Sequence, residues 1–73
     1  DANGNTVLGQ HVGIATKNST IFSSGDHLVT TIGLEDCVVV HTERSTLVAK
    51  LDDEAQIKEL LATLENEGLE TFL

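Results

Sequence analysis

The stretch VTTIGLEDCVVVHTERSTLVA, residues Val29–Ala49, decides the expected fold of this 73-residue chain. It contains two runs rich in β-branched residues, separated by the bend Gly-Leu-Glu-Asp at residues 33–36, and a third run after a polar turn at residues 43–45. β-Branched side chains favour extended backbone, whereas Gly and Asp adopt the conformations that tight bends need. The stretch therefore predicts three strands joined by short turns.

The valine run Val38–Val40 is continuously apolar instead of alternating. A strand that is covered on both faces has this pattern, so Cys37–Thr42 is predicted to be the central strand. Similar short runs recur through residues 1–50 at a spacing of roughly 8–10 residues, which fits a β-meander, a barrel fragment or a short solenoid. The other runs are Thr6–Leu8, His11–Thr16, Thr20–Ser23, His27–Ile32 and Thr46–Lys50.

Region 52–67 has a helical pattern, with an α-helix expected at about residues 54–67. Apolar side chains recur at positions i, i+3, i+4 and i+7, which places them on one stripe of a helix. A helix of this length is marginal in isolation, so the stripe is expected to dock on the strands and to cap one end of the β part. The stripe consists of Ile57, Leu60, Leu61 and Leu64.

Both ends of this helix carry sequence signals. Asp52 or Asp53 is expected to be the N-cap, with its carboxylate accepting a backbone N–H near the positive end of the helix. Gly68 is expected to stop the helix, because glycine readily adopts the left-handed conformation found at C-termini. Residues 68–73 form an apolar tail that is expected to pack against the domain.

Composition excludes several classes of function. A chain of 73 residues makes one domain at most, and its net charge is −8 from 12 acidic and 4 basic residues. Phosphate backbones and anionic lipids repel such a chain, so neither a nucleic acid nor a membrane is expected as a partner. No apolar run reaches the roughly 20 residues of a membrane span. The single cysteine, Cys37, excludes an internal disulfide and suits a reducing compartment such as the cytoplasm.

No catalytic, cofactor-binding or metal-binding residue is predicted. Cys37 and His41 lie four residues apart and hence on one face of a strand. A structural zinc site needs two more ligands, and the spacing of His11 and His27 matches no compact ligand pattern. The acidic and apolar neighbours of Cys37 disfavour a reactive thiolate, so a structural thiol is preferred over a nucleophile. The carboxylate pairs are interpreted as turn and capping residues and not as acid–base pairs; they are Glu35/Asp36 and Asp52/Asp53.

Several short motifs occur in the order and spacing typical of one enzyme family. They are Asp1–Asn5, Lys17–Ser19, Leu28–Val40 with His41-Thr42, Leu47–Ala49, Gln56–Lys58 and Gly68–Glu70. Together they make the whole chain resemble the C-terminal domain of bacterial mannose-1-phosphate guanylyltransferases. The resemblance implies a short left-handed parallel β-helix-like module, mainly β, with one C-terminal helix.

The resemblance also implies a division of labour in a larger parent enzyme. Such enzymes bind GTP and, with magnesium, convert GTP and mannose 1-phosphate to GDP-mannose and pyrophosphate. Their nucleotide loop, metal-binding aspartate and sugar-phosphate lysine belong to an upstream nucleotidyltransferase domain, which is absent here. The chain departs from the family pattern in two places: His41 stands where many members have an acidic residue, and Ser45-Thr46 stands where many have an Asp-Ala pair. These differences are interpreted as simple substitutions in a turn, in preference to a changed interface or ligand contact.

Residues 1–73 are therefore expected to be a single non-catalytic domain: strands and turns over 1–50, a capping helix over 52–67 and the tail. The first residue is not methionine, which fits a fragment. Expected partners are the upstream domain, covering the end near residues 1–15, and further copies in a homo-oligomer. Two alternatives stay open. One is a free-standing oligomerisation or interaction domain, and the other is the same module from a nucleotidyltransferase acting on another sugar phosphate.

Overall fold

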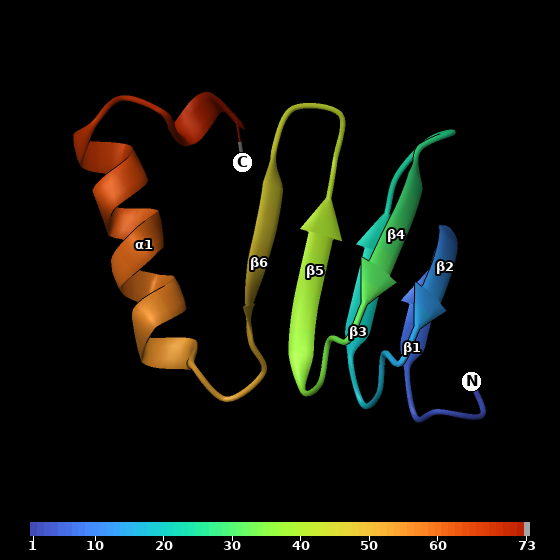
Figure 1. The fold of residues 1–73 in the computed structure, drawn as a ribbon. Helices are drawn as coiled ribbons and strands as arrows, with labels where there is room; N and C mark the ends of the chain where they lie inside the picture. The colour runs from blue at the N-terminus through green and yellow to red at the C-terminus, as the bar shows by residue number, and fades with distance from the viewer. Residues whose placement is uncertain (73) are drawn as a thin grey trace.

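The computed structural model describes residues 1–72, which form short strands followed by two helices (Figure 1). The chain is strand-rich up to residue 50 and helical afterwards, as the sequence predicts. The strands are β1 (Thr6–Leu8), β2 (Gln10–Ile14), β3 (Thr20–Ser23), β4 (Leu28–Ile32), β5 (Cys37–His41) and β6 (Thr46–Lys50). The helices are α1 (Glu54–Asn66) and the 3-10 helix η1 (Glu70–Phe72).

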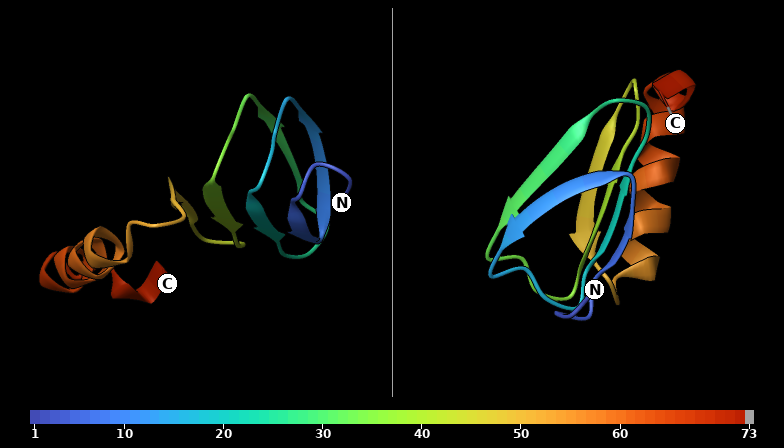
Figure 2. Two further views of the ribbon diagram at one scale, coloured as in Figure 1. Left: turned by 90° about the horizontal axis from the view of Figure 1, so that it is seen from below. Right: turned by 90° about the vertical axis from the view of Figure 1, so that its right-hand side faces the viewer.

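Successive strands alternate between two sheets. One sheet has the order β1-β3-β5-β6 and the other consists of β2 and β4; all pairs are parallel except the antiparallel pair β5–β6. β1 with β2 and β3 with β4 thus make two stacked coils of a parallel β-helix (Figure 2). The bend at residues 33–36 carries the chain from one sheet to the other. Of the three predicted architectures, the solenoid is confirmed, and β5 is an interior strand as expected.

The same corner conformation recurs from coil to coil. Gly4, Asn18 and Asp36 all have positive φ, at 79°, 52° and 55°. Each lies two residues before positions that pair in register across β1, β3 and β5. Stacked coils must turn at the same place, and Gly, Asn and Asp are the residues that tolerate the left-handed region best. Gly4, Asn18 and Asp36 therefore mark the same corner of the β-helix in three successive coils.

A polar ladder stacks directly after these corners, inside the molecule. Asn5 and Ser19 are buried, and Asn5 Oδ1 accepts a hydrogen bond from the Ser19 backbone N–H at 2.9 Å. Asn5 Nδ2 donates to the Thr16 carbonyl at 2.9 Å, and Ser19 Oγ accepts from the Cys37 backbone N–H at 3.2 Å. Buried polar groups are tolerated when they are bonded in this way. These hydrogen bonds link Asn5, Ser19 and Cys37, which occupy equivalent positions in successive coils.

The apolar core centres on one row of side chains across the four-stranded sheet, with Cys37 buried beside it. Val7, Ile21, Val39 and Val48 are paired in register on neighbouring strands. Ile21 and Val39 are only 1% and 4% exposed, whereas Val48 on β6 is 59% exposed. The β2–β4 sheet has no third strand to lie opposite β6 within residues 1–72. The core therefore ends abruptly at Val48.

Helix α1 lies beyond β6, alongside the end of the four-stranded sheet (Figure 1). Asp53 is the N-cap, but its side chain makes no cap hydrogen bond, so that part of the prediction is wrong. Its backbone has φ −100° and ψ 44°, outside the extended region from which N-cap side chains normally reach back. Gly68, at φ 73°, ends the helix as predicted, and the Leu69 N–H bonds to the Leu64 carbonyl at 2.8 Å.

The expected docking of the helix on the strands is incomplete. No residue of α1 is buried, and Leu60 in the middle of the apolar stripe is 42% exposed. Seen from below, the helix stands apart from the β-helix body (Figure 2). It runs beside the last strand of the sheet and does not cover a sheet face, so the stripe is only partly covered.

The tail packs by one edge only. Ser45 Oγ donates a hydrogen bond to the Phe72 carbonyl at 2.9 Å, and the Arg44 guanidinium lies 4.9 Å from the centre of the Phe72 ring. Leu69 and Phe72 nevertheless remain exposed. The tail is thus held at the β5–β6 turn and not in a core. The part of this prediction that concerns Leu73 falls outside the described residues.

Candidate functional site

The buried thiol of Cys37 is part of the β-helix interior. Its Sγ donates to the Glu35 carbonyl at 3.2 Å, and its backbone N–H is bound by Ser19 in the polar ladder. His41 lies at the other end of β5, about 13 Å away at the usual rise of a strand. The two side chains therefore cannot share one metal ion or act as a nucleophile and its base. These contacts agree with the predicted structural role of Cys37, which stays a prediction.

His27 and His41, which are 14 residues apart in the sequence, lie in contact at one end of the coils. The rings of His27 and His41 lie edge to face, with centroids 4.9 Å apart and planes at 76°. His41 Nδ1 also lies 2.7 Å from Thr46 Oγ1, across the β5–β6 pair. Ser23 Oγ donates to the His27 carbonyl at 2.8 Å and fixes the loop before β4. His41, where the sequence departs from the family pattern, thus contacts both the loop before β4 and the first residue of β6.

The third histidine belongs to a different part of the molecule. His11 Nε2 on β2 lies 2.8 Å from Thr31 Oγ1 on β4, and Thr31 Oγ1 lies 2.6 Å from Thr16 Oγ1. Within residues 1–72, no group of three or more His, Cys, Asp or Glu side chains is arranged to hold a metal ion. Every buried side-chain nitrogen or oxygen in that range has a hydrogen-bond partner. The histidines are accounted for by these contacts.

The carboxylate pairs lie in a turn and at the start of a helix, where the sequence places them, although Asp53 makes no capping hydrogen bond with its side chain. Glu35 and Asp36 are exposed, and Asp36 is the positive-φ corner before β5. Asp52 is exposed in the turn after β6, and Asp53 is the N-cap of α1. Asp53 also lines one of the two hollows described next, but no second carboxylate from residues 1–72 lines either hollow. The prediction that this chain carries no catalytic or cofactor-binding residue remains a prediction.

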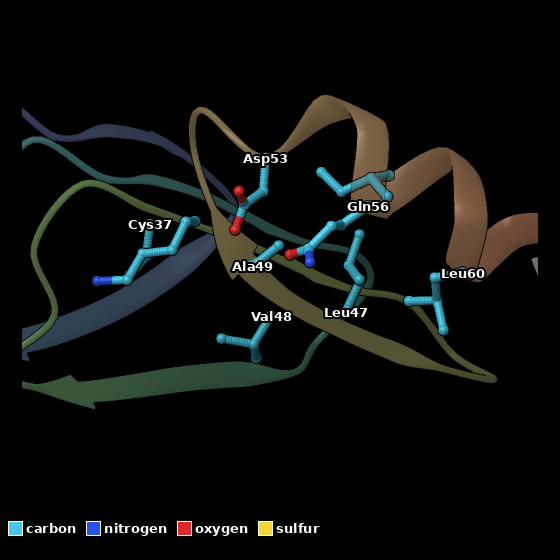
Figure 3. Close-up of a pocket in the computed structure, with 9 residues that line it drawn as sticks. Cys37, Leu47, Val48, Ala49, Asp53, Gln56 and Leu60 are labelled. Atoms are coloured by element: carbon cyan, nitrogen blue, oxygen red, sulfur yellow. The ribbon is translucent and has the colours of Figure 1, made fainter.

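An apolar groove runs between β6 and α1, and sequence reasoning missed it. It consists of two adjoining hollows of about 430 Å³ and 350 Å³, and both are lined by Leu47 and Leu60. Figure 3 shows the lining residues of the first hollow. The helical stripe was expected to be covered, and no sequence signal indicates that it is left open. The first hollow is completed by Cys37, Val48, Ala49, Lys50, Asp53, Gln56 and Ile57. The second is completed by Ser45, Thr46, Leu61, Leu64, Leu69 and Phe72.

The fold and these surfaces define a small parallel β-helix module with exposed apolar faces. The chain belongs to the MannoseP isomerase/GMP-like beta-helix domain family, whose model matches residues 9–64. It is 37% identical over 68 residues to a mannose-1-phosphate guanylyltransferase from Escherichia coli, and 37% identical to the alginate biosynthesis protein AlgA from Pseudomonas syringae pv. tomato. Both matches cover 93% of this chain.

A solved structure shares the architecture. The crystal structure described as mannose-1-phosphate geranyltransferase from Thermus thermophilus matches 89% of this chain with a TM-score of 0.74 and 29% identity. This chain spans only 14% of the length of the two curated relatives and 20% of the Thermus chain. The family resemblance and the β-helix fold inferred from the sequence are thus confirmed. Among residues 1–72, no helix is both long and apolar enough to cross a bilayer.

Proposed function

We propose that this chain is a non-catalytic structural module of a mannose-1-phosphate guanylyltransferase. In this proposal an upstream nucleotidyltransferase domain binds GTP, mannose 1-phosphate and magnesium in the cytoplasm and forms GDP-mannose and pyrophosphate. The single observation that carries the proposal is the match to a short part of enzymes so named, over 93% of this chain but 14% of theirs. The dispersed positions of Cys37, His11 and the His27–His41 pair support it, because a catalytic site needs such groups to converge.

The surface of the β2–β4 sheet supplies the physical basis for an assembly role. Val12, Ile14, Leu28 and Ile32 are all exposed on its outer side, and Ile32 is 78% exposed. These four side chains lie on paired strands, so they form one uncharged patch at the N-terminal coils. Exposed contiguous apolar patches mark interaction sites. In the proposed enzyme the catalytic domain, or a second subunit, covers this patch and the open end of the coils near residues 1–15.

A module exchange tests the proposal. This chain replaces the matching 68-residue segment in the Escherichia coli guanylyltransferase, and formation of GDP-mannose is assayed together with the sedimentation of the enzyme. We expect the chimera to be active. Ile14→Asp and Ile32→Asp together should weaken assembly or lower the melting temperature, with the KM for GTP unchanged within about twofold. Lys58→Asp, on α1, is the matched control and should change none of these quantities.

Two results would contradict the proposal. One is a chimera that assembles normally but whose Ile14/Ile32 variant loses kcat without any loss of stability, since that would place the patch in catalysis. The other is a chimera that prefers a different nucleotide or sugar phosphate from the parent, since a structural module should not set specificity. If this chain alone forms a stable oligomer through the β2–β4 patch and shows no tendency to join the enzyme, the alternative of a free-standing oligomerisation domain is favoured instead.

A further inference from the structure

The strand β6 presents a free edge toward helix α1. In its antiparallel ladder with β5, the Leu51 N–H bonds to the Asp36 carbonyl at 2.9 Å, and the Thr42 N–H bonds to the Ser45 carbonyl at 2.9 Å. Bonded and non-bonded pairs alternate along an antiparallel ladder. Every second residue of β6 therefore turns its backbone N–H and C=O away from β5 and toward the groove. These outward-facing residues are Thr46, Val48 and Lys50.

Most of these outward groups have no partner in residues 1–72. The Lys50 carbonyl accepts the Asp53 N–H at 3.3 Å, but both backbone groups of Val48 remain unbonded at the centre of the strand. Unpaired edge groups of this kind are a template for another strand. The free edge is five residues long and lies beside the apolar side chains of the groove. A segment that binds there therefore has to be short, extended and partly apolar.

The side chains at this edge define that occupant further. The core row through Ile21 and Val39 ends at Val48, which is 59% exposed. A strand added to β6 would place a side chain directly beside Val48, and an apolar one would extend the row. Lys50 is exposed on the same face, two residues further along, and pairs with Cys37 on its other side. An acidic side chain beside Lys50 would satisfy its charge, because opposite charges stabilise cross-strand pairs.

The size of the groove selects a single segment. Its hollows of about 430 Å³ and 350 Å³ lie between β6 and the stripe residue Leu60. Such volumes suit a small ligand or a few residues of peptide, whereas a stable association of two folded domains needs about 800 Å² from each partner. Helix α1 also stands alongside the edge, so the whole sheet of a second copy cannot approach it (Figure 2).

We propose that the groove between β6 and α1 binds an extended segment of a partner protein by strand addition. The segment pairs with β6 in the antiparallel direction, which is the more stable one per residue. It places an apolar side chain beside Val48 and an acidic side chain beside Lys50, and its opposite face contacts Leu47 and Leu60. This mode of recognition uses main-chain hydrogen bonds for affinity and alternate side chains for specificity.

The probe is the synthetic peptide acetyl-TEVVVTT-amide, titrated into the 15N-labelled 73-residue chain and followed by NMR. Antiparallel pairing centred on Val48 puts its glutamate beside Lys50. We expect the amides of Thr46, Val48 and Lys50 to shift and to become protected from exchange. The matched peptide acetyl-TKVVVTT-amide should bind about fivefold more weakly, and Lys50→Glu should reverse the preference between the two peptides.

Val48→Pro tests the backbone contact directly. Proline is tolerated on an edge strand when its missing N–H faces outward, so the variant should keep its circular-dichroism spectrum and lose binding. Val48→Thr, which keeps the N–H, should still bind. If Val48→Pro does not fold, the test rests on whether Lys50→Glu reverses the preference between the two peptides. Absence of binding at millimolar peptide, shifts confined to β2 and β4, or protection of the β6 amides by dimerisation without peptide would each overturn the proposal.

Discussion

The hydroxyl oxygen of Ser19 accepts a hydrogen bond from the backbone N–H of Cys37 at 3.2 Å, and this contact joins two coils of the β-helix. Ser19 is 1% exposed, and its hydroxyl hydrogen is donated in turn to the Lys17 carbonyl at 3.0 Å. One side chain thus satisfies a backbone group in each of two consecutive corners. Because these groups are buried away from water, their bonding is worth more than that of a surface serine.

Replacement of Ser19 by alanine should therefore be costly. Ser19→Ala leaves the Cys37 N–H unsatisfied, and the free energy of unfolding should fall by about 1–3 kcal/mol. Urea unfolding followed by circular dichroism measures the change. Thr30→Ala, on the exposed face of β4, is the control and should cost less than about 0.5 kcal/mol. Equal losses for the two variants would show that the ladder is not a source of stability.

The core row and the helical stripe should respond very differently to truncation. Ile21 is almost fully buried, so Ile21→Ala should lower the free energy of unfolding by about 2–5 kcal/mol. Leu60 is 42% exposed beside the groove, so Leu60→Ala should cost less than half as much. Thermal or urea unfolding compares them. A larger loss for Leu60 would mean that α1 is docked more tightly than its exposure indicates.

Ala15 occupies a position that glycine would fill better. Its φ of 55° lies in the left-handed region, where an L side chain costs roughly 1–2 kcal/mol, and it aligns with Gly33 in the next coil. Ala15→Gly should raise the free energy of unfolding by about 0.5–1 kcal/mol, after allowance for the greater entropy of glycine in the unfolded chain. Ala49→Gly, in the extended strand β6, should instead lower it by a similar amount. Melting temperatures that move in the same direction for both variants would contradict the corner geometry.

Much of the local structure follows from the sequence. The strand positions come from β-branched runs between turn residues, and helix α1 comes from an apolar stripe of period 3.6 that Gly68 ends. Both are local signals. The valine run at residues 38–40 also places β5 correctly inside its sheet, although only Val39 is buried and Val38 and Val40 on the other face are half-buried.

The pairing of strands and the position of the helix do not follow from local signals. The bend at residues 33–36 can join two strands of one sheet or lead from one sheet to another, and only the stacked corners decide between them. The apolar stripe shows which face of α1 avoids water but not whether anything covers it. Ala15 carries no turn signal, since residues with a side chain such as alanine rarely adopt the positive φ that it has here. The groove beside β6 depends on these non-local features, which is why it was not predicted.

The most direct test of the central claim, that this chain is structural and not catalytic, is isothermal titration calorimetry of the 73-residue protein with GTP and magnesium, followed by mannose 1-phosphate. The account predicts no measurable binding heat for either ligand at millimolar concentration, because no group of three or more His, Cys, Asp or Glu side chains in residues 1–72 is arranged to hold the magnesium ion that accompanies GTP. Tight, magnesium-dependent binding of GTP to this chain would contradict it.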